Sequence, residues 1–223
     1  LITVLLVALC VVIRLAYDNR AATFLQVAIL DTGLWVTIGE VDSTLLSLLA
    51  SRSQLLIHAL GTNHEAMKWQ RWQFQMAGIL GRASAEVVSD LRELPYEDKL
   101  INQLVVAADS VSAVTLIEAG RVLCPNGVLV LERPQAFDVE EFSSQIRGSG
   151  LKLIESNNAD SERWVRAVKV RPAGMDIWTH INHDAGRNRV SQDLLVDVPT
   201  GLRWVAAPEW SDEPVIGTLS AHG

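Results

Sequence analysis

The chain of 223 residues is long enough for one α/β domain with an appendage and too short for two large domains. Its 49% hydrophobic content excludes disorder of the whole chain, and a formal net charge of −7 without any run of Lys or Arg argues against a nucleic-acid partner. The two cysteines, Cys10 and Cys124, cannot build a disulfide framework or a thiolate metal site.

The chain opens with an apolar segment, residues 1–19. Leu1–Ile13 is apolar apart from Thr3, and Arg14 interrupts the run. As a helix this run would be about 20 Å long, short of the roughly 30 Å hydrocarbon core of a bilayer. Its length is typical of an export signal or a truncated membrane anchor, and a buried core helix is the alternative. We therefore expect an exported protein, either periplasmic or associated with a membrane through this segment.

Residues 20–171 show strands alternating with helices. The predicted strands are Leu34–Ile38, Leu55–Leu60, Ala85–Ser89, Leu104–Ala107, Val128–Leu131, Leu151–Glu155 and Trp164–Val170. The predicted helices are Arg20–Leu30, one capped by Asp42-Ser43-Thr44, one capped by Thr62-Asn63, Thr115–Leu123 and Val139–Arg147. The alternation implies right-handed crossovers and a doubly wound, mostly parallel sheet, with the last two strands as an antiparallel edge hairpin.

Glycine and proline mark the expected ends of several elements. Gly33 is positioned to stop the helix Arg20–Leu30, and the run Cys124-Pro125-Asn126-Gly127 is expected to be a turn that ends another helix. In a sheet of this kind ligands bind at the carboxyl ends of the strands, near the point where strand order reverses. The loops after Ile38, Leu60, Ser89 and Ala107 are therefore the candidate site.

At these loops the chain, over roughly residues 30 to 170, resembles a class I S-adenosylmethionine-dependent methyltransferase. The stretch Val36–Ser43 stands where that family has a strand followed by a Gly-x-Gly-x-Gly turn. Gly39 survives, next to Glu40, while Val41 and Ser43 replace the later glycines. Valine supplies neither positive φ nor room for close backbone approach, so we expect a narrowed pocket in this Rossmann-like domain.

The other cofactor motifs of the family are altered or kept in part. Gly61, followed by Thr62, stands where the family has a carboxylate that binds the ribose hydroxyls, whereas Asp90 and Leu91 match the adenine-side acidic position. Three further stretches carry the likeness: Leu94-Pro95-Tyr96-Glu97-Asp98 resembles Leu-Pro-Phe-x-Asp, Asn102-Gln103-Leu104 replaces Asp-x-Val, and Glu118–Val128 is close to Leu-Lys-Pro-Gly-Gly. The resemblance thus implies cofactor contacts at Gly39, Glu40, Val41, Gly61, Thr62, Asp90 and Leu91, and it names no catalytic residue.

Histidines and tryptophans offer further candidates. His58 and His64 lack the spacing of metal ligands, so we interpret them as solvated or helix-capping side chains. Trp69, Trp72 and Phe74 lie at helical spacing and are predicted to pack against the sheet. The cluster of His180 and His183 with Asp176 and Asp184 is interpreted as capping of a tight loop, so no metal site is expected.

Residues 172–223 differ in kind, being polar, rich in turns and free of helical period. The stretch Asp176–Asp184, followed by Gly201-Leu202-Arg203-Trp204-Val205, resembles the first segment of quinoprotein-like β-propellers, the pyrroloquinoline-quinone repeat family. About fifty residues cannot supply the several blades of a propeller. We expect an extended tail in a fragment of a longer protein, whose own missing C-terminal propeller would be its partner.

Two functions follow from these expectations. The first is a degenerate, non-catalytic structural or interaction module of a larger exported quinoprotein-like protein, with no cofactor firmly implied. The alternative is an active or residual S-adenosylmethionine-dependent methyltransferase with an unknown acceptor. The altered glycine turn and Gly61 favour the first, and export would remove the protein from the compartment where the methyl donor is made. The same two positions disfavour a nicotinamide-binding domain.

Overall fold

The computed structural model describes residues 32–39, 41, 46–47, 49–50, 53–112, 114–133, 139–146, 148–154 and 164–195. The chain divides into two compact units, with the boundary between Val170 and Arg171. The apolar segment 1–19 and the predicted helix Arg20–Leu30 lie outside the described residues. Within the described residues, no helix is both long and apolar enough to cross a bilayer.

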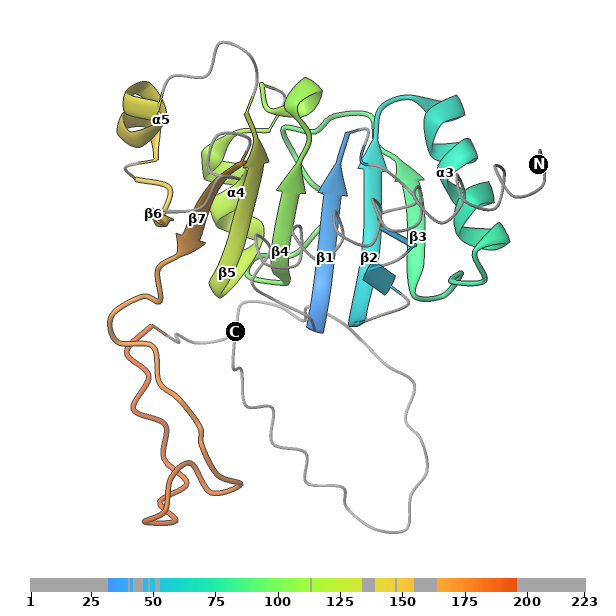
Figure 1. Ribbon diagram of the computed structural model, residues 1–223. Helices are drawn as coiled ribbons and strands as arrows, with labels where there is room; N and C mark the ends of the chain where they lie inside the picture. Colours follow the sequence, from blue (N-terminus) through green and yellow to red (C-terminus); the bar gives the residue numbers. More distant parts are fainter. Residues whose placement is uncertain are drawn as a thin grey trace, which may run out of the picture. The chain divides into compact units, whose positions relative to one another are not determined.

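The described part of the first unit is built on one seven-stranded sheet with the order β3-β2-β1-β4-β5-β7-β6 (Figure 1). The strands are β1 (Thr32–Ile38), β2 (Gln54–Gly61), β3 (Ala83–Val87), β4 (Ile101–Val106), β5 (Leu123–Glu132), β6 (Leu151–Ile154) and β7 (Trp164–Lys169). β1 to β5 run parallel, and β7 is antiparallel to both β5 and β6. The predicted mostly parallel sheet with an antiparallel edge is confirmed, and β7 lies between β5 and β6.

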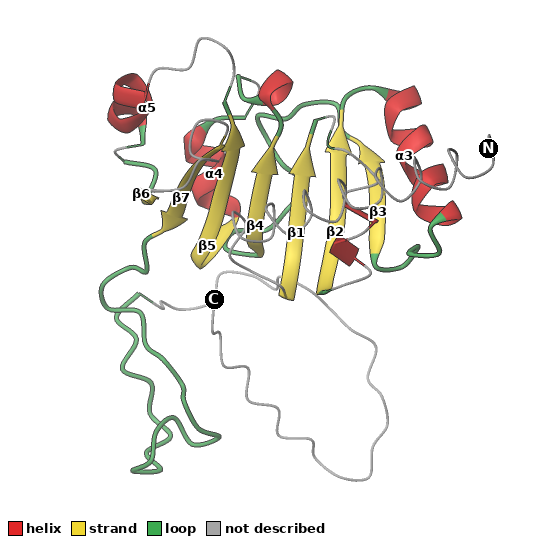
Figure 2. Ribbon diagram, viewed as in Figure 1, coloured by secondary structure: helices red, strands yellow, loops and turns green. Residues whose placement is uncertain are grey.

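Helices cover both faces of this sheet (Figure 2). The described helices are α3 (His64–Met76), the short 3-10 helix η1 (Ala108–Ser110), α4 (Leu116–Val122) and α5 (Val139–Gln145). Alternate residues of β1 enter two different cores, as the pleat of a strand requires. Trp35 belongs to the core that includes Phe74 of α3, and Val36 belongs to the core on the other face, which includes Val122 of α4 and Phe142 of α5.

Asn102, at the start of β4, connects three strands at the amino end of the sheet. Its Oδ1 accepts a hydrogen bond from Leu34 N at 2.9 Å, and its Nδ2 donates to Cys124 Sγ at 3.4 Å. Gly33 lies inside β1 with φ of +98°, and a Cβ there would stand 2.5 Å from Asn102 Oδ1. Glycine is needed here because the asparagine side chain comes close. The helix that Gly33 was predicted to stop lies outside the described residues, so that prediction stays untested.

The run Cys124–Gly127 is not the predicted turn, because it lies within β5. β4 pairs Ile101 with Leu123 and then Gln103 with Val128, so four residues of β5 bulge opposite one of β4. Asn126 has φ of +66°. Proline and Asn-Gly are suited to a bulge for the same reasons that they suit a turn, namely a missing N–H and tolerance of left-handed backbone.

The prediction that both α3 tryptophans pack against the sheet is wrong. Phe74 is fully buried, but Trp69 is 58% and Trp72 48% exposed. The two indoles stack on each other with ring centroids 4.6 Å apart and an interplanar angle of 22°. The buried face of α3 is instead made by Met67, Gln70 and Phe74, whose spacing is equally helical.

Candidate functional site

The carboxyl ends of the parallel strands meet at the edge of the sheet where strand order reverses between β1 and β4. Ile38 of β1 pairs there with Leu60 of β2 and with Val106 of β4. Such a reversal is the usual ligand site of an open α/β sheet. The loops after these strands hold the residues predicted from the sequence, apart from Glu40, which lies outside the described residues.

Gly39 follows β1 directly and has φ of +88°. Its N–H donates to the Leu60 carbonyl at 3.1 Å, and its carbonyl accepts from Val41 N at 3.1 Å. A Cβ at this position would stand 2.5 Å from Ser110 Oγ and 2.6 Å from Asp109 Oδ1. Both the left-handed backbone and the close approach of the η1 side chains therefore require glycine. The packing of this protein explains Gly39 without any ligand.

Gly61 ends β2 and lies against Met67 of α3. A Cβ at Gly61 would stand 2.8 Å from Met67 Cε and 3.1 Å from its Sδ. Met67 is only 2% exposed, so its thioether fills the space that a longer side chain at position 61 would need. Thr62 is exposed, and the half-buried Val41 packs against the same core as Met67.

Asp90 is an exposed carboxylate paired with Arg92. Arg92 Nη2 donates to Oδ2 at 2.8 Å, and Nε donates to Oδ1 at 3.0 Å. The Arg92 backbone N–H also donates to Oδ1 at 2.9 Å. The side-chain bonds from Arg92 lower the pKa of Asp90, which is therefore ionised and accepts only. The neighbouring Leu91 is buried in the core on the α4 face.

Glu118 and Arg121 of α4 hold the connection between β3 and β4. Glu118 Oε1 accepts from Leu94 N at 2.7 Å and from Arg121 Nη2 at 2.6 Å. Arg121 Nη1 also donates to the Tyr96 carbonyl and to Asp98 Oδ1, each at 2.8 Å. The bonds from Arg121 lower the pKa of Glu118, while Glu118 and Asp98 raise the pKa of Arg121. This network is structural, because its carboxylates and guanidinium bind one another and backbone.

The sequence interpretation missed a contact between His58, Tyr96 and Glu86. The Tyr96 hydroxyl lies 2.6 Å from His58 Nδ1, and His58 Nε2 lies 3.4 Å from Glu86 Oε2. His58 is therefore a half-buried strand residue, and the solvated or helix-capping interpretation is wrong for it. Burial lowers the pKa of His58 despite Glu86, and burial also raises the pKa of Tyr96. Both side chains are thus uncharged near pH 7.

Strand register is the signal that could have found part of this contact. His58 pairs with Ser84 and Leu60 with Glu86, so His58 and Glu86 project from the same face of neighbouring strands. Tyr96 could not be placed in this way, since it comes from a connection of irregular path. Chemically, the chain of hydroxyl, imidazole and carboxylate fastens that connection to β2.

The described part of the second unit, residues 171–195, contains no helix or strand and holds itself together through Asp176 and His183. His183 Nε2 lies 2.7 Å from Asp176 Oδ2, and its Nδ1 lies 3.2 Å from Asp184 Oδ2. Asp176 Oδ2 also accepts from Gln192 N at 2.8 Å. The cluster therefore fastens the loop, as side-chain capping would. Among the described residues, no three His, Cys, Asp or Glu side chains are grouped to hold a metal ion.

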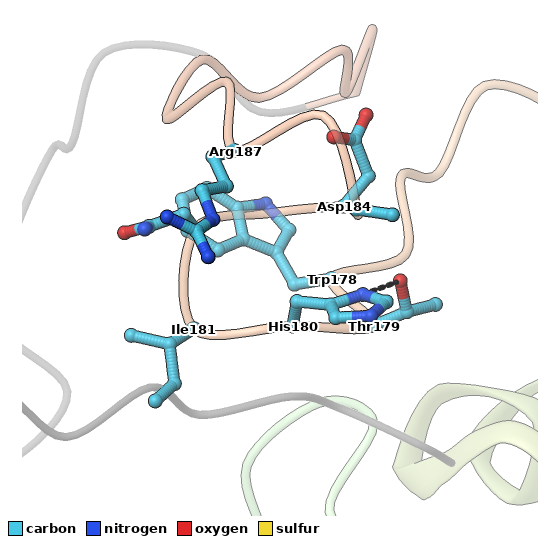
Figure 3. Close-up of a pocket in the computed structure, with 8 residues that line it drawn as sticks. Trp178, Thr179, His180, Ile181, Asp184 and Arg187 are labelled. Atoms are coloured by element: carbon cyan, nitrogen blue, oxygen red, sulfur yellow. Dashed lines mark hydrogen bonds between the residues drawn. The ribbon is translucent and has the colours of Figure 1, made fainter.

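This unit also has an open hollow of about 740 Å³ (Figure 3). Trp178 and Arg187 are among the residues that line it, and Thr179 Oγ1 lies 2.8 Å from His180 Nδ1. Asp184 brings a charge opposite to that of Arg187. The lining therefore carries charges of both signs, and it favours neither an anionic nor a cationic ligand.

No protein-family model matches the chain, and no curated protein matches it. Solved structures do. The [4+2]-cyclase SpnF matches with a TM-score of 0.57 and 13% identity, over 70% of this chain and 82% of its own. A SAM-dependent methyltransferase from Aquifex aeolicus matches with 0.54 and 15%, over 67% and 89%. Geranyl diphosphate methyltransferase in complex with SAM (S-adenosylmethionine) matches with 0.50 and 12%, over 68% and 85%.

The chain has the class I methyltransferase fold. At these identities the likeness extends to the fold alone, so the residues at the strand ends have to decide what this methyltransferase-like domain does. At the end of β2, Gly61 has no carboxylate and the Met67 side chain lies beside it. The propeller resemblance stays a prediction, since residues 196–223 lie outside the described part.

Proposed function

We propose that this methyltransferase-like domain transfers no methyl group and serves as a structural or interaction module of a larger, exported protein. The observation that carries the proposal is the contact of Gly61 with Met67. The position expected to bind the ribose has no carboxylate, and a buried thioether fills the space beside it. The site therefore lacks a strong anchor for the nucleoside.

The missing carboxylate has a large effect on affinity. A hydrogen bond to a charged group contributes about 1.5–3 kcal/mol, which corresponds to about ten- to a hundredfold in the dissociation constant. Asp90 does not replace it, since its oxygens are already bound by Arg92. A ligand at Asp90 would have to replace these bonds, so Asp90 alone would leave low affinity at most.

The turn after β1 supports the same conclusion. Ser110 and Asp109 close one side of Gly39, and Val41 directs its side chain into the core where the family pattern has a further glycine. Close approach of a ligand to backbone amides needs open glycines. The turn of this chain offers one glycine, and the protein itself has packed against it.

The fold neighbours set the alternative. SAM-dependent methyltransferases share the fold, which makes an active or residual methyltransferase the competing function. A [4+2]-cyclase also shares it, so the fold by itself does not require methyl transfer.

Calorimetric titration with S-adenosylmethionine and with its demethylated product separates the two functions. We expect no binding heat up to about 1 mM ligand, because the ribose anchor is absent. A dissociation constant in the micromolar range would contradict the proposal and support the methyltransferase. Circular dichroism checks that the titrated protein is folded, so that an absence of binding heat cannot be caused by unfolded protein.

A further inference from the structure

One face of α3 is apolar and exposed, on the side of the helix opposite the core. Trp69, Trp72 and Met76, which we call the α3 ridge, are 58%, 48% and 69% exposed. Their spacing of three and four residues places them in one row along the helix. Since Met67, Gln70 and Phe74 bury the other side, the ridge is not needed to attach α3 to the sheet.

The ridge has the residue types that favour the boundary between water and lipid. Indole rings carry a large apolar body and one polar N–H, which is why tryptophan is enriched at membrane interfaces. The two indoles stack on each other with ring centroids 4.6 Å apart, so they present a single broad surface. Glu65 and Lys68 line an open hollow of about 280 Å³ together with the two tryptophans.

Lys68 is the cation that lines the hollow at the ridge, together with one carboxylate, Glu65. Two further cations belong to the same region of the chain: Arg71 donates to the Ala85 carbonyl and Arg82 to the Leu55 carbonyl, so they lie toward the sheet. Lys68 is exposed and has no carboxylate partner among the described residues. A cation beside exposed tryptophans suits the phosphate layer of an anionic membrane.

We propose that the α3 ridge, with Lys68, rests in the headgroup layer of a bilayer that contains anionic phospholipid. The tryptophans would lie at the depth of the lipid carbonyls, and Lys68 would contact headgroup phosphate. This surface is distinct from the apolar segment Leu1–Ile13. The inference goes beyond the proposed function, since it holds whether or not the strand ends bind a cofactor.

Cosedimentation of the full chain with phosphatidylcholine vesicles, with and without about 30% phosphatidylglycerol, tests the proposal. The wild-type chain is expected to bind the anionic vesicles at least about fivefold more tightly than the neutral ones. Trp69→Gln with Trp72→Gln is expected to lower the partition coefficient about tenfold or more. Lys68→Glu is expected to abolish most of the preference for anionic lipid.

Ile117→Gln is the matched control. Ile117 is 76% exposed on α4, which covers the other face of the sheet, so this variant should bind vesicles within about twofold of wild type. Unchanged binding of the double tryptophan variant would overturn the proposal, even if Leu1–Ile13 still binds lipid. Should the wild type form dimers that the double variant loses, without any vesicle binding, the ridge is a contact between copies and the proposal fails. If the double variant does not fold, Lys68→Glu decides.

Discussion

The two ends of the parallel sheet compare differently with the motifs of the family that the sequence resembles. At the amino end Asn102 stands where an aspartate is usual, yet its Oδ1 still accepts the Leu34 N–H at 2.9 Å. At the carboxyl end Gly61 stands where a carboxylate is usual, and Met67 fills the space beside it. Asn102 makes a hydrogen bond of the fold, and at Gly61 we propose that a ligand contact is missing. The residues that make this fold are therefore separable from those that would make it bind a nucleoside.

The largest expected effect is on stability, and it follows from removing the Asn102 hydrogen bond at the amino end of the sheet. Asn102→Ala leaves the part-buried Leu34 N–H without its acceptor, so the free energy of unfolding should fall by about 1–3 kcal/mol. Urea denaturation followed by circular dichroism measures it. Asn102→Asp keeps the acceptor oxygen and should recover most of the loss, whereas Asp90→Ala at the other end should not move the urea midpoint. Equal losses for Asn102→Ala and Asp90→Ala would contradict the comparison.

Placing a carboxylate at the carboxyl end of β2 should increase ligand affinity by an amount of free energy similar to the loss of stability expected for Asn102→Ala. Gly61→Asp with Met67→Ala supplies the carboxylate and empties the space that Met67 Cε now occupies. Affinity for S-adenosylhomocysteine should rise about ten- to a hundredfold over the wild type, measured by calorimetry at high ligand concentration. Met67→Ala alone is the control and should give no gain. If both variants bind no better than wild type, Gly61 is not at the ribose position.

The contact between Tyr96 and His58 gives a smaller effect on stability. Tyr96→Phe removes a hydrogen bond of 2.6 Å and should lower the free energy of unfolding by about 0.5–1.5 kcal/mol. Urea denaturation at neutral pH measures this change. Glu97→Gln, next to Tyr96 in the sequence but outside this contact, is the matched control and should change little. An unchanged midpoint for Tyr96→Phe would show that the hydroxyl does not fasten the connection to β2.

The smallest effects are those of pH, and they have opposite signs in the two units. Burial lowers the pKa of His58 below 6.5, so its contribution is full above pH 6.5 and is lost as the pH falls through the folded value. The two carboxylates raise the pKa of His183 above 6.5, so its contribution is full below pH 6.5 and is lost as the pH rises through the folded value. NMR titration of the imidazole protons should give His58 a midpoint below 6.5 and His183 a midpoint above 6.5. Two midpoints on the same side of 6.5 would contradict the assigned contacts.

The alternation of strands and helices could be predicted from the sequence because it depends on local pattern. Contacts between residues distant in the sequence could not be predicted in this way. The contact of Asn102 with Gly33 and Leu34 could not be predicted, because Asn102 is 68 residues from Leu34 in sequence. Helical spacing alone gave α3 two apolar rows, Met67 with Phe74 and Trp69 with Trp72, and only packing on β2 and β3 decides which row is buried.

For the candidate site, the sequence pointed to loops that do meet at the carboxyl edge of the sheet, and the assignment of Gly61 to the ribose position stays a prediction. The sequence could not show that Met67 fills the space beside Gly61, because this depends on how α3 lies against the end of β2. The bond between Asp90 and Arg92 joins residues two positions apart and was in principle readable as a local turn. The path of Tyr96 toward His58 was not, since an irregular connection carries no period.

The most direct test of the filled ribose position is the methyl resonance of Met67. In a sample with carbon-13-labelled methionine methyl groups, the Met67 signal is assigned with Met67→Leu, and the exposed Met76 serves as an internal reference. We predict contacts between the Met67 methyl protons and Gly61 Hα in the free protein, and no shift of the signal with S-adenosylhomocysteine up to about 1 mM. A saturable shift of Met67 at micromolar ligand, with Met76 unchanged, would show an open nucleoside site and contradict the account.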